Sequence, residues 1–228
     1  MTTALSGPGG RANQKARTRA AILEACDELV RSGAEVSMPE VAARAMVSEA
    51  TAYRYFPDLI SLLQEAMEGL WPAAAQALAP VADSRDPVER VTFACEYLLR
   101  GVHAYQGAVR AMISYTITAP AQARARPGIR FGLIDHALAP FAAPASPGQA
   151  SCMGGSRPLI SSMGGSSPPY PLAPLAPDAM TRLKQDLAIV LSAEAFFVLT
   201  DLCGLAPDDA ISSAARTAAV LTRAAFAG

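Results

Sequence analysis

Two helix-start patterns near the N-terminus constrain the fold of this chain more than any other feature. The first is the capping box Ser37-Met-Pro-Glu40, in which the serine can accept a hydrogen bond from the Glu40 amide and the proline sits in the first turn. The second is Ser48, which can cap a helix that Pro57 ends. Two short helices joined by a turn of about three or four residues have the spacing of a helix-turn-helix. The helices expected are 38–45 and 49–56.

A longer helix is expected before this pair. Apolar residues recur at helical spacing between Ile22 and Val30, and Gly33 is placed to end the helix. The helix is therefore predicted to span about 13–32. Residues 1–12, which start with a stretch rich in glycine, serine and proline, are predicted to form a disordered tail.

The rest of the chain, 59–228, is predicted to form a larger helical domain. Hydrophobic residues make up 51% of the sequence but aromatic residues only 6%, and the abundant alanine favours helix. A second capping box, Asp86-Pro-Val-Glu89, and a cap at Asp178 mark further helix starts. The whole fold is thus predicted to be all-α. The further helices expected are 59–70 with an extension to 78 kinked at Pro72, 87–105, 108–118, 129–139, 178–203 and 207–225.

Residues 144–177 interrupt this helical pattern. They hold many of the 18 prolines of the chain, together with glycine and serine. They also contain a crude repeat, since 151–158 and 161–168 share the run Met-Gly-Gly-Ser. Two copies do not build a repeat architecture, so this segment is predicted to be a flexible insertion in the helical domain.

The helix 49–56 has one apolar and one polar side. Ala52 and Phe56 can pack on the helices behind it, with Val47 in the turn beneath. The outward side chains suit a DNA groove, because hydroxyls donate to phosphates, arginine can bind guanine, and a small residue lets the backbone approach the bases. These outward residues are Glu49, Ala50, Thr51, Tyr53, Arg54 and Tyr55.

A helix that meets only solvent would also carry polar residues. Two tyrosines on the exposed side are unusual for such a helix. The start of the first helix adds a local positive charge, because residues 1–23 contain basic side chains and no acid. These basic residues, which can reach flanking phosphates, are Arg11, Lys15, Arg17 and Arg19. Residues 13–58 are therefore interpreted as a helix-turn-helix DNA-binding domain.

The run from Val41 to Pro57, with Ile22-Leu-Glu-Ala25 before it, resembles the DNA-binding domain of the TetR family of bacterial regulators. The family pattern reads roughly I-L-x-A, then I-A-x-x-A-G-V-S-x-x-T-x-Y-x-H-F-x-x-K. Residues 13–65 follow it closely, and beyond them the resemblance is one of architecture. It implies a larger all-helical domain for ligand binding and dimerisation. It also implies a transcriptional repressor that binds a palindromic operator of double-stranded DNA as a dimer and is released by a small, largely apolar effector.

The resemblance assigns roles to individual positions. Thr51, Tyr53 and Tyr55 would contact DNA, with Ser48 near the phosphates. The start of the preceding helix would also face a phosphate through its free amides. Together with Ala50 and Arg54 from the groove argument, the DNA-binding residues expected are Lys15, Arg17, Thr18, Ser37, Met38, Ser48, Ala50, Thr51, Tyr53, Arg54 and Tyr55.

The sequence departs from the family pattern at several positions. Met46 stands where the family usually has the turn glycine, and a left-handed non-glycine residue costs on the order of 1 kcal/mol. Tyr55 replaces the usual histidine and keeps a polar tip. Leu59 replaces a common lysine, which removes a phosphate contact. Glu49 adds a negative charge close to the DNA. These departures bear on affinity more than on function.

The resemblance further implies dimerisation through the last two long helices and a ligand pocket in the larger domain. The helices concerned would be 179–203 and 208–226, although an intramolecular core explains their apolar residues as well. A two-fold operator favours the dimer. The candidate polar residues of the pocket are His103, Tyr105, Tyr115, His136 and Glu194.

Other classes of protein leave fewer traces in the sequence. There is no G-x-S-x-G motif, no Walker loop and no cluster of metal ligands, so neither an enzyme nor a cofactor or metal site is expected. The alternative that stays open is a helical small-molecule-binding protein without DNA-binding activity, which the net charge of −1 favours. No secretion signal or membrane span is visible, which predicts a cytoplasmic protein.

Overall fold

The computed structural model describes residues 8–118, 128–143 and 174–227. These residues form helices and no strand, apart from an isolated bridge between Ala142 and Leu175. The all-α prediction is confirmed. Most of the insertion predicted at 144–177, together with residues 1–7, lies outside the described residues. None of the helices described is long and apolar enough to cross a membrane.

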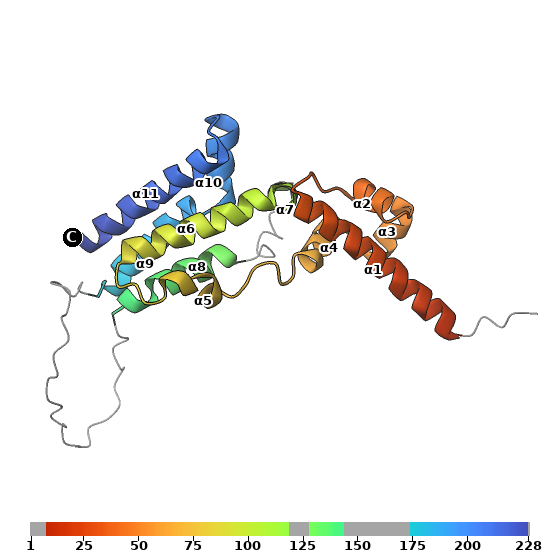
Figure 1. The fold of residues 1–228 in the computed structure, drawn as a ribbon, viewed down its shortest axis with the longest axis horizontal. Coiled ribbons are helices and arrows are strands. Elements are labelled where there is room, and N and C mark those ends of the chain that lie inside the picture. The colour runs from red at the N-terminus through yellow and green to blue at the C-terminus, as the bar shows by residue number, and fades with distance from the viewer. Residues whose placement is uncertain (1–7, 119–127, 144–173, 228) are drawn as a thin grey trace, which may run out of the picture.

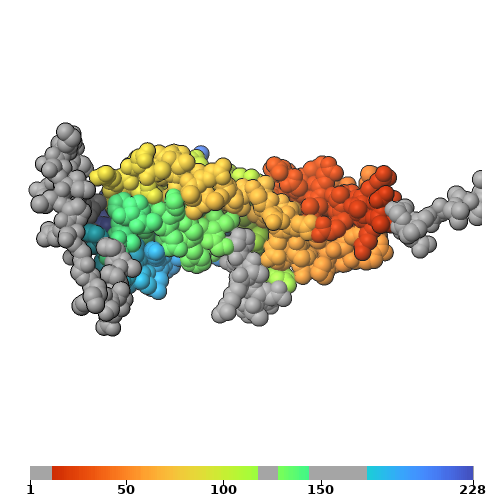
Figure 2. All heavy atoms as spheres, turned by 90° about the horizontal axis from the view of Figure 1, so that it is seen from below, coloured from red at the N-terminus to blue at the C-terminus, as the bar shows by residue number. Residues whose placement is uncertain are grey.

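Four helices form one end of an elongated molecule, as Figures 1 and 2 show. The predicted pair of short helices is present with nearly the expected bounds. The first helix starts at Pro8 rather than at residue 13, so the assignment of residues 8–12 to a tail is wrong. Proline fixes φ near the helical value and suits the first helical position, which explains the early start. The helices are α1 (Pro8–Ser32), α2 (Met38–Arg44), α3 (Glu49–Tyr55) and α4 (Leu59–Ala66).

The second part of the molecule is a bundle in which α11 packs along α6 and α9 (Figure 1). The bundle's α-helices are α5 (Ala74–Ala77), α6 (Pro87–Ala104), α8 (Ile129–Leu138), α9 (Pro177–Val190), α10 (Ala193–Phe197) and α11 (Pro207–Ala227). Short 3₁₀ turns cover Ala79–Val81 and Ala139–Phe141, and the π-helix η4 covers Val198–Leu202. At the junction of the two parts lies α7 (Gln106–Thr118).

Two predicted long helices are broken. The helix expected over 59–78 ends at Ala66, because Gly69 adopts a left-handed φ of 81° and Pro72 follows. The helix expected over 178–203 stops at Val190, and Ser192 caps a new helix by accepting a hydrogen bond from the Ala195 amide at 3.0 Å. Asp178 is not a cap but lies in the first turn of α9.

The structure has two hydrophobic cores. The smaller one holds α1–α4 together and includes Ala108 and Met112 of α7. It therefore continues past residue 58, the limit predicted for the first domain. The larger core joins α6, α8, α9 and α11. Residues of α9 and α11 whose apolar stripes were predicted to suit a dimer interface, among them Leu187 and Ala218, are buried in this core within one chain.

The end of the predicted insertion is part of the folded bundle. The Leu175 amide donates a hydrogen bond of 3.0 Å to the Phe141 carbonyl oxygen, and the Leu175 side chain is buried in the larger core. Pro177 opens α9. Residues 174–177 therefore belong to the domain rather than to an insertion, because a buried leucine fixes this segment against the bundle.

Candidate nucleic-acid interface

The turn between α2 and α3 has the tight geometry of a helix-turn-helix. Met46 adopts a left-handed φ of 55°, the conformation that a glycine would take without strain. The turn is closed by hydrogen bonds from the Met46 amide to the Ala43 oxygen at 3.1 Å and from the Val47 amide to the Ala42 oxygen at 2.9 Å. The methionine side chain is 92% exposed, so it gains little packing there.

Side-chain caps fix the starts of the short helices. The Glu40 amide donates to Ser37 Oγ at 3.4 Å, and the Ser37 hydroxyl donates to the Glu40 carboxylate at 3.0 Å. The Thr51 amide donates to Ser48 Oγ at 3.2 Å. Sequence patterns predicted both caps. Each cap stabilises its helix by about 1 kcal/mol and sets the direction in which the helix leaves the turn.

The inner side of α3 packs against the smaller core, as predicted. Ala52 and Phe56 are buried in the smaller core, and Val47 packs against it. Arg19 of α1 lies over the Phe56 ring at 4.9 Å and forms a two-pronged ion pair with Glu65 of α4, at 2.6 and 2.5 Å. Arg19 thereby ties α1 and α4 together behind α3. It is one of the basic residues predicted to reach DNA phosphates, but its exposed guanidinium is engaged in this ion pair.

The outer side of α3 presents polar and aromatic side chains. Ala50, Tyr53 and Arg54 are exposed, with Tyr53 at 48%. On α1, Lys15 and Arg17 are exposed as well. Among the residues that the structure describes, no ion pair engages Lys15, Arg17 or Arg54. Positive charge is therefore available on the side where α3 faces outward.

The structure brings α1 and α3 together at one hollow. Lys15 and Gln14 of α1 line it from one side, and Arg54 and Tyr55 of α3 from the other. Its volume is about 320 Å³. A concave surface with a cation on each wall suits a negatively charged backbone that passes between the two helices. Lys15 thus shares one surface with Arg54 and Tyr55.

Several predicted contact residues have other roles. The Met38 side chain is only 3% exposed and belongs to the core, so the predicted phosphate contact of Met38 concerns its backbone amide at the start of α2. Tyr55 is half-buried against the core. Thr18 donates to the Gln14 carbonyl oxygen at 3.0 Å, and the Thr51 hydroxyl lies 2.9 Å from the Ser48 hydroxyl.

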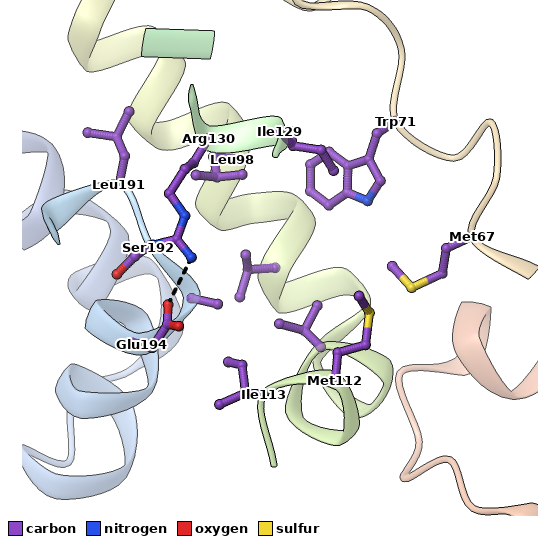
Figure 3. A pocket seen from close by; sticks show the side chains of 13 residues that line it. Met67, Trp71, Leu98, Met112, Ile113, Ile129, Arg130, Leu191, Ser192 and Glu194 are labelled. Carbon is purple, nitrogen blue, oxygen red and sulfur yellow. Dashed lines mark ion pairs between the residues drawn. The ribbon is translucent and has the colours of Figure 1, made fainter. Parts of the chain in front are cut away.

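The second candidate site is a cavity of about 90 Å³ between the two cores (Figure 3). Its walls are mostly apolar, and Trp71 lies across it from the ion pair of Arg130 and Glu194. Among the candidate pocket residues only Glu194 lines it. Its lining residues include Met67, Trp71, Met112, Arg130, Ser192 and Glu194.

The other candidate pocket residues lie elsewhere. His103 is exposed, with its ring 5.9 Å from that of Phe196. Tyr105 stacks edge-on with Trp71 at 6.1 Å, behind the cavity wall. Tyr115 lines a different surface hollow, and the backbone oxygen of His136 accepts a hydrogen bond from Arg90. Polar residue type alone therefore does not identify the residues that line this cavity, whereas the chain's one tryptophan and a charged residue on an apolar helix do lie on it.

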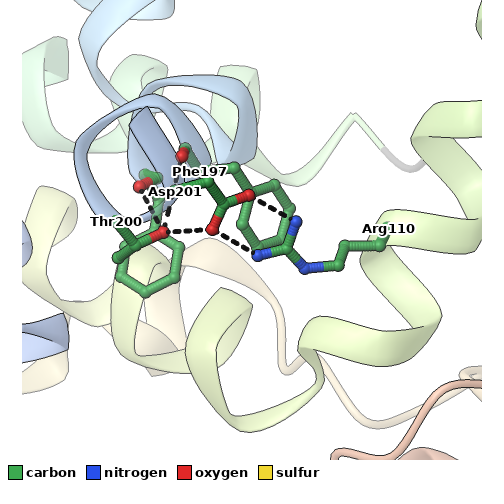
Figure 4. A network of polar contacts seen from close by, with 5 residues as sticks. Arg110, Phe197, Thr200 and Asp201 are labelled. Carbon is green, nitrogen blue, oxygen red and sulfur yellow. Dashed lines mark hydrogen bonds and ion pairs between the residues drawn. The ribbon is translucent and has the colours of Figure 1, made fainter. Parts of the chain in front are cut away.

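A polar network connects α7 with η4 (Figure 4). Arg110 forms two hydrogen bonds with the Asp201 carboxylate, at 2.6 and 2.7 Å, and lies 3.8 Å over the Phe197 ring. The Thr200 hydroxyl also donates to Asp201 at 3.0 Å. Hydrogen bonding by Arg110 lowers the pKa of Asp201 below its ordinary value. The network ties the helix beside the smaller core to the C-terminal part of the bundle.

A capped helix pair around a tight turn, with an exposed polar second helix and a basic first helix, defines a helix-turn-helix DNA-binding domain. Residues 22–66 match the family model described as bacterial regulatory proteins, tetR family. The N-terminal domain belongs to this family, and the chain is a TetR-like DNA-binding regulator. The match ends at Ala66, the last residue of α4, and covers the C-terminal part of α1 together with α2, α3 and α4. Neither the curated proteins nor the solved structures include a significant match.

Proposed function

We propose that the protein is a repressor that binds a palindromic operator as a homodimer and leaves it when a small, largely apolar effector binds. The helix α3 enters the major groove, and its side chains Tyr53 and Arg54 contact the DNA. Lys15 and Arg17 bind the backbone beside that groove. The position of Lys15 and Arg54 on opposite walls of one hollow supports this arrangement.

The proposal that an effector controls DNA binding rests on one observation above all. The cavity between the cores is lined by Met67 and Met112, which belong to the core of the DNA-binding domain. Met67 caps the end of α4, and Met112 lies in α7. An effector that displaces these side chains moves α4 and α7 against α1, and α1 packs on α2, which in turn packs on α3. Methionine suits this role, because its flexible thioether can repack around a guest.

Exposed apolar residues support the homodimer. Ile189 of α9, Val198 and Leu202 of η4, and Val220 of α11 are exposed, the last three at 48%, 80% and 60%. They lie on the elements that correspond to the predicted dimer helices 179–203 and 208–226. Large apolar side chains left on such helices are typical of a protein interface. Two copies joined there would present two α3 helices to a two-fold operator.

The purified protein should sediment as a dimer and shift DNA from its own upstream region. The alternative is a helical small-molecule-binding protein that does not bind DNA. A monomer that fails to shift DNA even at low salt, where phosphate contacts are strongest, would favour that alternative.

A further inference from the structure

Two hollows of the bundle meet at the same polar residues. The apolar cavity beside Trp71 measures about 90 Å³, and a wider groove of about 610 Å³ lies along α9, α10 and α11. Arg130, Ser192 and Glu194 line both of them. A molecule that occupied the inner cavity and extended into the groove would therefore pass these three side chains.

The pair of Arg130 and Glu194 is loosely formed. Arg130 Nη2 lies 3.5 Å from Glu194 Oε2, and Arg130 Nη1 donates to the Ala188 oxygen at 3.3 Å. A well-formed charge-assisted hydrogen bond is about 2.7–2.9 Å long. The Arg110–Asp201 pair in the same protein reaches 2.6 and 2.7 Å. The Arg130–Glu194 pair thus leaves room for a group that bonds to both partners.

The Ser192 hydroxyl already forms hydrogen bonds at the start of α10. Its hydroxyl donates to the Ile189 oxygen at 2.8 Å and accepts from the Ala195 amide at 3.0 Å. Recognition of a polar group here therefore falls to Arg130, which can only donate, and to Glu194, which as a carboxylate can only accept. Among the described residues that line the cavity, these two are the charged ones.

We infer that the effector is an uncharged amphiphile whose polar head accepts a hydrogen bond from Arg130 and donates one to Glu194. This inference rests on the proposed effector function of the cavity. A primary carboxamide has both capacities and can replace the direct contact of the pair while satisfying both groups. A carboxylate head would suit Arg130 and repel Glu194, and an ammonium head would do the reverse.

The volume of the inner cavity limits the size of the effector's apolar end. An engineered cavity of about 150 Å³ in another protein holds one benzene molecule. The inner cavity here is smaller, at about 90 Å³, so it accepts a short alkyl chain rather than a ring system. A longer effector would extend past Arg130 into the outer groove, which has the room for it.

Trp71 supplies the readout, because it is the chain's one tryptophan and lines the cavity. The full-length protein is titrated separately with hexanamide, hexanoate and hexylammonium at one pH and ionic strength, and the tryptophan fluorescence emission is measured. We expect hexanamide to bind about tenfold or more tightly than either ion, since a hydrogen bond to a charged group contributes about 1.5–3 kcal/mol.

Two variants reverse the preference. Glu194→Gln leaves the arginine charge and should favour hexanoate, whereas Arg130→Gln leaves the carboxylate and should favour hexylammonium. Asp135→Asn is the matched control. It breaks the 2.7 Å ion pair with Lys184, which joins α8 to α9 as the Arg130–Glu194 pair joins α8 to α10. Neither Asp135 nor Lys184 lines the cavity, so the order should be unchanged.

The inference is overturned if either ion binds the unmodified protein as tightly as hexanamide, or if none of the three binds. The helical circular dichroism signal of each variant shows whether it folds. If a variant does not fold, the order of probe affinities in the unmodified protein alone tests the inference. DNA binding is measured separately without any probe. Intact DNA binding with the wrong probe order overturns this inference only, whereas absent DNA binding with the expected order overturns the proposed repressor.

Discussion

Met46 adopts a backbone conformation that disfavours its residue type. It has the one positive φ among the described non-glycine residues, and its exposed side chain gives little packing in return. Met46→Gly should therefore raise the free energy of unfolding by about 0.5–1 kcal/mol. Urea denaturation followed by circular dichroism measures this change. Met46→Ala, which keeps a Cβ, should show almost none of the gain. A glycine variant less stable than the native protein would mean that the turn is not strained.

Tyr53 carries the proposed DNA contact at the residue scale. Its side chain is 48% exposed, whereas its neighbour Ala52 is fully buried. Tyr53→Ala should weaken operator binding by about 1–3 kcal/mol per half-site and leave the helical circular dichroism signal and the dimer intact. Fluorescence anisotropy with labelled DNA gives the affinity. Tyr53→Phe serves as control, because it removes the hydroxyl alone. Unfolding of the alanine variant would show instead that Tyr53 is part of the core.

Arg90 holds several elements of the bundle together. It is buried, with 2% exposure, and donates to the backbone oxygens of Val81, Ala82, His136 and Ala137 at 2.6–3.0 Å. These oxygens lie at the ends of a 3₁₀ turn and of α8, where the helix dipole favours a cation. Burial lowers the pKa of Arg90 from its ordinary value.

Replacing Arg90 should destabilise the bundle. Arg90→Met fills similar volume but leaves buried carbonyl oxygens without a donor, so we expect a loss of about 2–4 kcal/mol. Arg100→Met is the control on the same helix, because Arg100 is exposed and only weakly paired. Equilibrium urea unfolding compares the two variants. Equal stability of both would contradict the structural role of Arg90.

The Arg110–Asp201 pair joins α7 to η4 and makes a pH-dependent contribution to stability. Because the pKa of Asp201 is lowered in the folded state, the pair stabilises the fold above the carboxyl's unfolded pKa of about 3.9 and loses this effect as pH falls through the folded value. Native protein should therefore be more stable than Asp201→Asn at pH 7, and the two should converge toward pH 2–3. A difference that persists at low pH would contradict the ion pair.

The local signals in the sequence predicted the short elements well. The serines at 37 and 48 define their helices through contacts within one turn, and Ala52 and Phe56 show by their spacing which side is buried. The predictions of two long helices were wrong, because Gly69 with its left-handed backbone and the helix cap at Ser192 interrupt runs that look continuously apolar. The burial of the Met38 side chain could not be predicted from the sequence, because it depends on packing across the domain.

At the scale of the whole molecule, the cavity could not be predicted from sequence. Its walls come from α6, α7, α8, α10 and the segment after α4, and no spacing in the sequence links Trp71 to Arg130 or Glu194. The same holds for the Arg110–Asp201 contact, whose partners are far apart in the chain. These contacts arise only when the two cores are assembled around α7. The helix-turn-helix depends on contacts within a short stretch of sequence, so its elements were much easier to predict.

The central claim is that α3 and the basic start of α1 read an operator. Selection of bound fragments from the source genome by the purified protein tests it most directly. We predict enrichment of a short palindrome whose half-sites lie about 10 base pairs apart, or a multiple of this, because two copies of α3 must reach successive major grooves. Recovery of fragments without a shared sequence, no better than with the Tyr53→Ala variant, would contradict the account.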